Sequence, residues 1–369
     1  MRILHIISSF SPGGAEVFTQ NLLIRLSSKA EVFLCAVNQS KDRSFEQFML
    51  NPLQKNGIQC FFLVKKARRD RIKAIFQLRH LIQKLKPDIV HTHLEYINLL
   101  TVIAMVGMKM PLVHTVHNIN IGYSAAHRFF LRLRVSQYIA ISDKIKNIIN
   151  KKLHVDSNKI TMIHNGIDLE PFYQHKNPVL EKVTRIIAIG RLKQQKNYPI
   201  LFCAFQYLIK KLRQENLPLP ILSIVGTGSL EKELKAIVER LGIKQSIQFL
   251  GVRRDIPDLL QKHDIYVMAS KWEGLSISLI EAIASGIPVV ATRVGSNEEI
   301  VTHQKEGLLV EPVEIKPLAE ALYQLIKDYR LRKKMSLNAV KKANKFGINQ
   351  CAKDYLGLYQ SIVSDRHKE

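Results

Sequence analysis

Short runs of apolar residues alternate along the chain with stretches in which apolar residues recur at helical spacing. The runs are continuous and do not alternate with polar residues, as is typical of strands buried on both faces of a parallel sheet. The alternation of the two patterns predicts βαβ winding. In the first half we expect strands at 3–7, 32–37, 89–91, 112–115, 138–141 and 160–163, and helices at 16–26, 71–86 and 99–110.

The pattern breaks at Asn165 and later restarts. An Asn-Gly-Ile-Asp turn signal is followed by a polar, proline-containing stretch without periodicity, and then apolar runs return. We therefore expect an α/β protein with two Rossmann-like, doubly wound parallel-sheet domains, because the length also favours two domains. The expected strands of the second half are 185–189, 221–225, 247–250, 265–268, 289–292 and 308–310, and a helical stretch covers 317–346.

These boundaries define four segments. Residues 1–168 form the first domain, 169–184 a linker, and 185–346 the second domain. A helix within 347–369 is expected to pack back on the first domain.

Charge is the unusual feature of the composition. Lys and Arg number 55 against 31 Asp and Glu, which gives a net charge of +24. Such a surface attracts polyanions, whether nucleic acid, anionic lipid or phosphorylated substrates, and does not choose among them.

Cysteines and hydropathy indicate the compartment. The four cysteines are far apart and include no Cys-x-x-Cys pair, which favours buried thiols in a reducing compartment over a zinc site. No stretch reaches the roughly 18 to 20 apolar residues that a membrane span requires. The first apolar run is too short for a signal peptide, so we expect a cytoplasmic protein.

Candidate residues lie in the loops that follow strands, because ligands of open α/β sheets bind beyond the carboxyl ends of the strands. Gly13 and Gly14 open the first helix and favour an anion there, although a plain tight turn explains them equally well. Arg191 has a planar guanidinium that can donate two parallel hydrogen bonds, and Lys196 has a compact ammonium charge, so together they suit a diphosphate. The alternative is that the two belong to a solvated basic loop without a ligand. Gly226 lies in a Gly-Thr-Gly loop that lacks the third glycine of a dinucleotide fingerprint.

Two glutamates, Glu273 and Glu281, lie eight positions apart, one on a loop and the other about two turns into a helix. Two carboxylates at different depths of one cleft suit a ligand that carries hydroxyl groups at two places, such as a nucleotide-sugar. By spacing alone, the simpler explanation is that Glu273 caps a helix and Glu281 is solvated.

His117 stands just past a strand, where a lone histidine is most often structural. Glu299 follows a Gly-Ser loop that offers backbone N–H groups to an anion.

The order of these motifs resembles that of the retaining glycosyltransferases of the GT-B fold, family 4. The shared order is a Gly-Gly loop, a histidine, the Asn-Gly-Ile-Asp linker, the Arg/Lys loop, the Gly-Thr-Gly loop, an E-x7-E pair and a Gly-Ser loop. The resemblance covers nearly the whole chain and is most specific over 249–310. It implies two domains facing a central cleft and transfer of a sugar from a UDP- or GDP-linked donor. The implied acceptor is a saccharide or lipid-linked saccharide in bacterial cell-surface polysaccharide or lipopolysaccharide synthesis.

The resemblance also implies roles for single residues. Arg191 and Lys196 hold the diphosphate, Glu273 contacts hydroxyls of the donor sugar, and Glu281 binds the ribose. His117 lies beside the donor sugar, and with Arg191, Lys196 and Glu273 it forms the expected catalytic group. The remaining expected donor-binding residues are Gly13, Gly14, Gly226, Gly274, Leu275, Ser276 and Glu299.

No metal and no cofactor other than the nucleotide-sugar co-substrate is expected, because fixed cations can stabilise the departing diphosphate and the chain has no Asp-x-Asp motif. Retention follows from the family alone. Because no carboxylate stands out as a nucleophile, front-face attack guided by the leaving phosphate is the expected route.

Basic residues of the first half suggest peripheral contact with anionic lipid at the inner face of the cytoplasmic membrane. They are concentrated at 65–71 and at Arg128, Arg132 and Arg134, and each basic residue near such a surface contributes roughly 1 kcal/mol. A generally basic composition in the source organism is the alternative.

Two other functions remain open. A nonhydrolysing sugar-nucleotide epimerase shares the architecture. A basic nucleic-acid-binding protein is the weaker alternative. It should show aromatic-interleaved basic patches or a recognition helix, whereas this chain has only Trp272 and scattered Tyr and Phe, so no nucleic-acid partner is expected.

Overall fold

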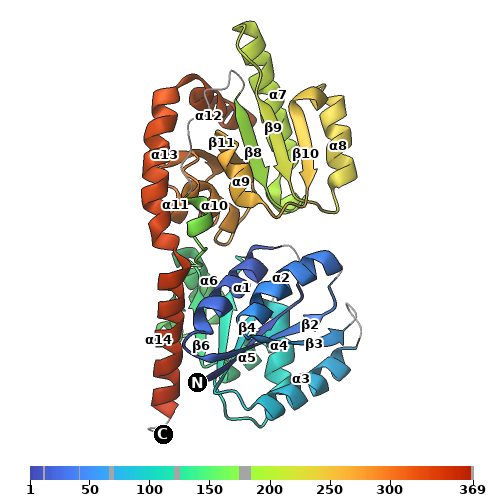
Figure 1. The fold of residues 1–369 in the computed structure, drawn as a ribbon, viewed down its shortest axis with the longest axis vertical. Helices are drawn as coiled ribbons and strands as arrows, with labels where there is room; N and C mark the ends of the chain where they lie inside the picture. Colours follow the sequence, from blue (N-terminus) through green and yellow to red (C-terminus); the bar gives the residue numbers. More distant parts are fainter. Residues whose placement is uncertain (11–12, 41, 66–69, 120–124, 174–183, 367–369) are drawn as a thin grey trace. The chain divides into compact units, whose positions relative to one another are not determined.

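The computed structural model describes residues 1–10, 13–40, 42–65, 70–119, 125–173 and 184–366 of the 369-residue chain. It divides the chain into two compact units (Figure 1). Unit 1 contains Met1–Gly166 and Ile348–Glu369, and unit 2 contains Ile167–Gly347. Each unit is a parallel sheet flanked by helices, which confirms the two doubly wound sheets predicted from the sequence. Most of the predicted linker, residues 174–183, lies outside the described residues.

The sheet of unit 1 has seven parallel strands in the order β3-β2-β1-β4-β5-β6-β7. The strands are β1 (Arg2–Ile7), β2 (Glu31–Asn38), β3 (Gln59–Lys65), β4 (Ile89–His93), β5 (Leu112–Val116), β6 (Gln137–Ala140) and β7 (Ile160–Met162). The helices are α1 (Gly14–Leu26), α2 (Arg43–Lys55), α3 (Arg71–Leu85), α4 (Glu95–Ala104), α5 (Ala125–Arg134), α6 (Asp143–Leu153) and α14 (Ile348–Arg366).

The sheet of unit 2 has six parallel strands in the order β10-β9-β8-β11-β12-β13. The strands are β8 (Arg185–Ile189), β9 (Ile221–Val225), β10 (Ile247–Gly251), β11 (Ile265–Met268), β12 (Val289–Thr292) and β13 (Gly307–Val310). The helices are α7 (Tyr198–Gln214), α8 (Glu231–Arg240), α9 (Ile256–Gln261), α10 (Ile277–Ala284), α11 (Asn297–Ile300), α12 (Ile315–Lys327) and α13 (Tyr329–Ala343).

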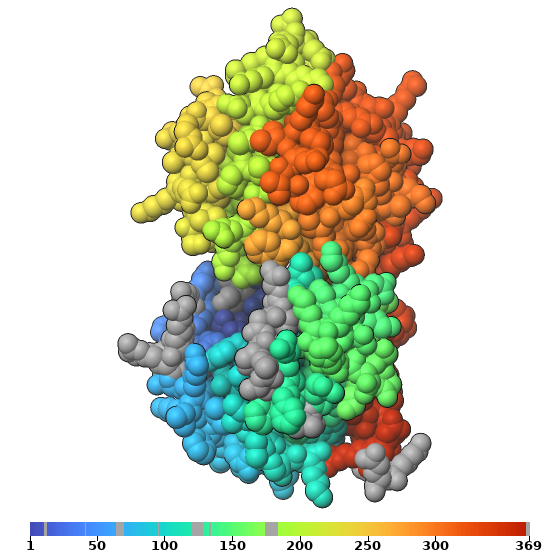
Figure 2. All heavy atoms as spheres, turned by 180° about the vertical axis from the view of Figure 1, so that it is seen from behind, coloured from blue at the N-terminus to red at the C-terminus, as the bar shows by residue number. Residues whose placement is uncertain are grey.

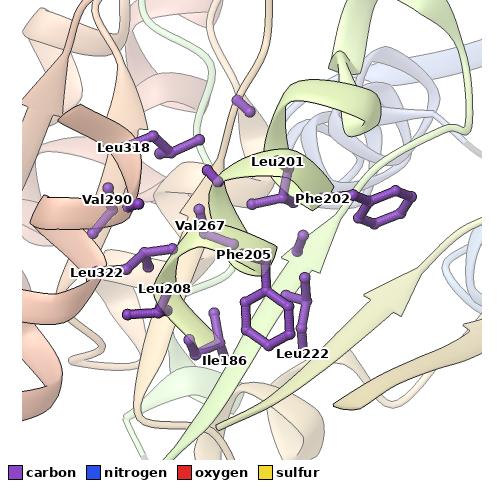
Figure 3. Packing of buried hydrophobic residues seen from close by; sticks show 14 of the residues in the cluster. Ile186, Leu201, Phe202, Phe205, Leu208, Leu222, Val267, Val290, Leu318 and Leu322 are labelled. Carbon is purple, nitrogen blue, oxygen red and sulfur yellow. The ribbon is translucent and has the colours of Figure 1, made fainter. Parts of the chain in front are cut away.

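Unit 2 is held together by a core between α7, α12 and one face of its sheet. Phe205 and Leu208 of α7 lie against Ile186 and Leu222 of the sheet (Figure 3). α7 also packs against α12, whose Leu322 is fully buried. This core fixes the strands from whose carboxyl ends the candidate loops leave.

The C-terminal helix α14 belongs to unit 1, where it packs against α1. It carries two fully buried tyrosines, Tyr355 and Tyr359. Both reach histidine-containing strands of the sheet by hydrogen bonding, directly or through Thr115. The last helix of the chain is therefore part of the core of the first unit.

Two local predictions were wrong, and one strand was missed. The apolar stretch 99–110 is not one helix, because α4 ends at Ala104 and Gly107 adopts a positive φ of 79°. The stretch 317–346 is two main helices. Asp328 leaves helical geometry, and its side chain accepts the N–H of Leu331 at 2.8 Å, which begins α13. Strand β3 was not predicted at all.

Among the helices that the structure describes, none combines the length and apolar character needed to cross a bilayer.

Candidate active site

The strand order of unit 2 has a switch point between β8 and β11. The chain leaves β8 toward β9 on one side and leaves β11 toward β12 on the other. Loops that diverge at such a point leave a crevice beyond the carboxyl ends of the strands, where ligands of open α/β sheets bind. Arg191 and Lys196 lie in the loop after β8, and Glu273 lies in the loop after β11.

A salt bridge joins these two loops. Lys196 Nζ lies 2.7 Å from Glu273 Oε1, and the two side chains are only 16% and 7% exposed. The lysine side chain crosses Gly190, where an added Cβ would stand 2.8 Å from Lys196 Cε. The fold therefore brings together two of the predicted site residues, although the sequence did not predict that they pair.

Glu273 has two further partners, which the sequence did not identify as site residues. Ser270 donates its hydroxyl to Glu273 Oε1 at 2.6 Å. Gln195 donates its amide to Glu273 Oε2 at 3.3 Å and to the carbonyl of Trp272 at 3.0 Å. Three of roughly four acceptor positions of the carboxylate are therefore used within the protein. Gln195 could have been identified from the sequence only by its position, since it directly precedes Lys196.

The glutamate loop is held from its other side by the loop after β12. Gly295 has a φ of 58°, and an added Cβ there would lie 2.0 Å from the carbonyl oxygen of Glu273. The next residue, Ser296, donates its backbone N–H to the carbonyl of Gly274 at 3.1 Å. Only glycine allows this approach of two backbones, so residue 295 fixes the position of Glu273.

Free backbone donors follow Glu273. The N–H groups of Gly274, Leu275 and Ser276 donate to no acceptor among the described residues, and they lead directly into α10. Such groups at a helix N-terminus favour an anion. These three predicted residues therefore lie together beside Glu273.

Gly226 has a different role in this structure. Its N–H donates to the carbonyl of Gly251 at 2.7 Å, so that amide is not available to an anion. An added Cβ at this position would lie 2.2 Å from the carbonyl oxygen of Gly190. Gly226 therefore allows the loops after β8 and β9 to touch.

Glu281 lies on α10 and is partly exposed, and its carboxylate makes no hydrogen bond or ion pair with the residues that the structure describes. Burial of its carboxyl raises its pKa to about 8. The side chain is thus an unpaired acid that can take a proton or accept a hydrogen bond from a ligand.

The other predicted residues are spread over both units. Arg191 lies in the same loop as Lys196, is exposed, and its guanidinium forms no ion pair with a described residue. Glu299 is partly buried in α11. Gly13 and Gly14 lie at the start of α1 in unit 1, where the carboxylate of Glu16 lies against Gly13.

His117 belongs to unit 1 and follows β5. It is 7% exposed, its Nε2 lies 3.1 Å from Nδ1 of His93, and Phe18 contacts its ring. Burial lowers the pKa of His117 to about 4, so the imidazole is neutral at pH 7.

Comparison with known proteins gives matches over most of the chain. The family model described as "Glycosyl transferases group 1" matches residues 170–342, and the model "Glycosyltransferase Family 4" matches residues 12–171.

Two curated relatives are similar over most of their length. The Escherichia coli UDP-Gal:alpha-D-GlcNAc-diphosphoundecaprenol alpha-1,3-galactosyltransferase is 29% identical, over 87% of this chain and 91% of the relative. The Campylobacter jejuni GalNAc-alpha-(1->4)-GalNAc-alpha-(1->3)-diNAcBac-PP-undecaprenol alpha-1,4-N-acetyl-D-galactosaminyltransferase is 27% identical, over 98% and 99%.

Among solved structures, the HepE protein of Anabaena in complex with UDP and glucose superposes with a TM-score of 0.83. Its sequence identity is 21%, and the match covers 98% of this chain and 100% of that one. At this identity the likeness shows the fold.

The raised pKa of Glu281 predicts how stability depends on pH. The unfolded carboxyl loses its proton near its ordinary value of 4.5 and the folded one near 8, so folding becomes less favourable as pH rises between these values. Glu281→Gln removes this effect. We expect the difference in melting temperature, variant minus wild type, to be larger at pH 8 than at pH 5.

Fluorescence of Trp272, the single tryptophan, reports unfolding of unit 2. The exposed Glu233→Gln serves as the matched control and should show no such trend. A difference between Glu281→Gln and wild type that is the same at pH 5 and pH 8 contradicts the prediction.

Proposed function

This chain belongs to the group 1, family 4 glycosyltransferases and has their GT-B fold, and from that premise we propose that it is a retaining, metal-independent hexosyltransferase. The donor is a UDP-linked sugar. The acceptor is a saccharide carried on a polyprenyl diphosphate lipid, and the product serves cell-surface polysaccharide or lipopolysaccharide synthesis.

The salt bridge between Lys196 and Glu273 is the observation that carries this proposal. It holds a cation at the switch point of the sheet, with the free N–H groups of Gly274, Leu275 and Ser276 beside it. An ammonium group has three donors and only one of them is used by Glu273. A diphosphate is the ligand that uses such a set of donors most fully.

The proposed chemistry follows from charge. When the bond between sugar and phosphate breaks, negative charge develops on the departing UDP, and donors already held in place stabilise it most effectively. Lys196 and the exposed Arg191 supply the cations, and the backbone N–H groups add further donors. We assign to these groups the role that a divalent ion plays in metal-dependent transferases.

The two glutamates have different proposed roles. The carboxylate of Glu273 accepts three hydrogen bonds from its neighbours. It therefore chiefly orients Lys196, and few acceptor positions remain for a sugar hydroxyl. The carboxylate of Glu281 has no partner among the described residues and suits the two hydroxyls of a ribose. Because hydroxyl donors favour the ionised form, nucleotide binding should lower the pKa of Glu281. His117 keeps the role that the family implies, a contact with the donor sugar.

The names of two relatives support the donor and acceptor. The Escherichia coli enzyme is named for UDP-Gal and a diphosphoundecaprenol-linked sugar, and the Campylobacter jejuni enzyme for a PP-undecaprenol-linked acceptor. Attack on the same face of the sugar that the UDP leaves would retain its configuration, with the leaving phosphate receiving the acceptor proton.

A surface of unit 1 supports contact with a lipid bilayer. Helices α3, α4 and α5 contact one another in sequence, and their light-blue to teal atoms gather on one face of unit 1 (Figure 2). These three helices and the turn after α4, together called the α3–α5 surface, expose large apolar side chains: Ile72, Phe76, Ile103, Val106, Phe129 and Phe130. Part of the basic segment named above, 66–69, lies outside the described residues.

Cations accompany the apolar side chains of the α3–α5 surface. Arg71, Lys73 and Arg132 are exposed on the same helices. Large exposed apolar groups with cations beside them are typical of surfaces that enter the interface of an anionic membrane.

We predict that Lys196→Ala and Glu281→Ala each lower kcat/KM by at least about tenfold, equivalent to roughly 1.4 kcal/mol of lost transition-state stabilisation. The assay measures transfer from UDP-galactose, UDP-glucose or UDP-N-acetylgalactosamine to polyprenyl-diphosphate-linked N-acetylglucosamine. Lys193→Ala, an exposed lysine of the same loop, is the matched control and should stay within about twofold. Near wild-type activity of either site variant refutes the assignment. A new sugar-nucleotide formed from donor alone would indicate an epimerase.

Membrane contact is tested by flotation with vesicles of phosphatidylglycerol. We expect wild type to float at low salt and to be released in part at high salt, because screening weakens the basic contacts. Phe129→Ser with Phe130→Ser should reduce flotation several-fold, whereas Leu337→Ser, which alters an exposed leucine of unit 2, should not. Protein that stays in the soluble fraction at both salt concentrations rules out the membrane role.

A further inference from the structure

Buried polar groups of unit 1 form one continuous chain of hydrogen bonds from α14 to His117. The chain crosses the central strands β1, β4 and β5, in which His5 lies beside His91 and His93 lies beside Thr115. Its members, in order, are Tyr355, Thr115, His91, Tyr359, His5, His93 and His117.

The half of the chain nearest His117 consists of histidines. His117 Nε2 lies 3.1 Å from His93 Nδ1, and His93 Nε2 lies 3.0 Å from His5 Nδ1. His5 Nε2 then lies 3.4 Å from the hydroxyl of Tyr359.

The other half returns to α14. The Tyr359 hydroxyl lies 2.5 Å from His91 Nδ1, and His91 Nε2 lies 2.8 Å from Thr115 Oγ1. Thr115 Oγ1 finally lies 3.3 Å from the hydroxyl of Tyr355. Both tyrosines of α14 are fully buried, so the helix is hydrogen-bonded to the sheet at two points of this chain.

The histidines of the chain are neutral. Burial lowers the pKa of His5 to about 3 and of His117 to about 4, and burial with the neighbouring histidines lowers the pKa of His91 and His93 well below the ordinary value. A neutral imidazole carries one ring proton, so one nitrogen donates and the other accepts. Each imidazole therefore passes the same direction from one link to the next. A hydroxyl could accept at both of its links, but its own hydrogen would then lack an acceptor, so the favoured arrangement has all donors pointing the same way along the chain.

The buried end decides between the two directions. If Tyr355 donates to Thr115 and Thr115 donates to His91, every hydroxyl hydrogen has an acceptor. In the reverse direction His91 donates to Thr115, and the hydrogen of either Thr115 or Tyr355 is left without an acceptor among the described residues. A buried donor without a partner costs about 1–3 kcal/mol, so the donors point from Tyr355 toward His117.

We propose that Tyr359 is a positioning residue that, through His5 and His93, holds His117 as its Nδ1–H tautomer, and that His117 thereby offers an N–H donor to an oxygen of the donor sugar. This assignment of the recipient rests on the proposed transferase function. His117 Nε2 accepts from His93, and Nδ1 has no partner among the described residues, so Nδ1 is the atom left for a ligand. His117 in this state binds a hydroxyl oxygen and does not remove the acceptor proton at that atom.

The same histidines could suggest a metal site, because nitrogen atoms of His5, His91 and His93 lie within 4.8 Å of one another. All six ring nitrogens of these residues already take part in the chain. A metal ion would have to break it, and the hydrogen-bonded arrangement is therefore the one that we test.

Nitrogen-15 NMR of the histidine rings in the full-length protein tests the direction without substrate. We expect His5, His91, His93 and His117 all to be Nδ1–H at pH 7, the tautomer that free histidine adopts less often in water. Single His→Gln variants assign the signals. An Nε2–H tautomer at any of the four, or nitrogen shifts that change when Zn²⁺ is added, overturns the proposal.

Two variants that each remove one phenol hydroxyl from α14 test the role of Tyr359. Tyr359→Phe interrupts the chain between His91 and His5, so we expect the Nε2–H form of His117 to increase and kcat to fall about threefold to tenfold. Tyr355→Phe is the matched control, because Thr115 can still donate to His91. It should keep the His117 tautomer and stay within about twofold in kcat.

An unchanged His117 tautomer in Tyr359→Phe contradicts the proposal even if activity falls. Because the tautomers are measured without substrate, absence of sugar transfer with four Nδ1–H rings would refute the proposed function and leave the hydrogen-bond chain standing.

Discussion

The salt bridge between Lys196 and Glu273 is the interaction on which the site of unit 2 depends. It lies at the switch point of the sheet, it is largely buried, and Ser270 and Gln195 complete the partners of the carboxylate. Removing one partner of a buried pair leaves an uncompensated charge and typically costs about 3–5 kcal/mol. The pair therefore ties two loops together. On the proposed function it also holds a cation in place for the donor, and groups held in place in this way stabilise charge without reorganising at the moment of reaction.

Much of the fold could be predicted from the sequence because strands buried on both faces are continuously apolar. The strands of unit 2 were placed to within one residue at each end. Strand β3 was missed because it lies at the sheet edge beside a basic segment, and its Phe62 is 39% exposed. The break at Asp328 was missed because the helical pattern continues across it, and only the backbone geometry shows that its side chain begins a new helix.

Only the residues of the candidate site that belong to short sequence motifs could be predicted. The spacing and order of Arg191, Lys196, Glu273 and Glu281 pointed to a nucleotide-sugar, but the partners Gln195 and Glu273 are separated by 78 positions. The histidine chain was missed for the same reason, because the register that sets His5 beside His91 is a property of the sheet. One signal was present, since His91 and His93 alternate along β4 and must share a face. Unit 2 thus contains a charged pair and unit 1 a chain of hydrogen bonds between neutral groups, and each is formed by residues far apart in sequence.

If Lys196 and Glu273 act on the donor as one unit, their substitutions must be coupled. The most direct measurement is a double-mutant cycle for UDP binding by calorimetry, using wild type, Lys196→Met, Glu273→Gln and the double variant. We compare the fold-change in the Kd for UDP that Glu273→Gln causes in wild type with the fold-change that it causes in Lys196→Met. We predict that the two fold-changes differ by at least about threefold, as expected for residues in contact. The same fold-change whether or not Lys196 is present would contradict the account.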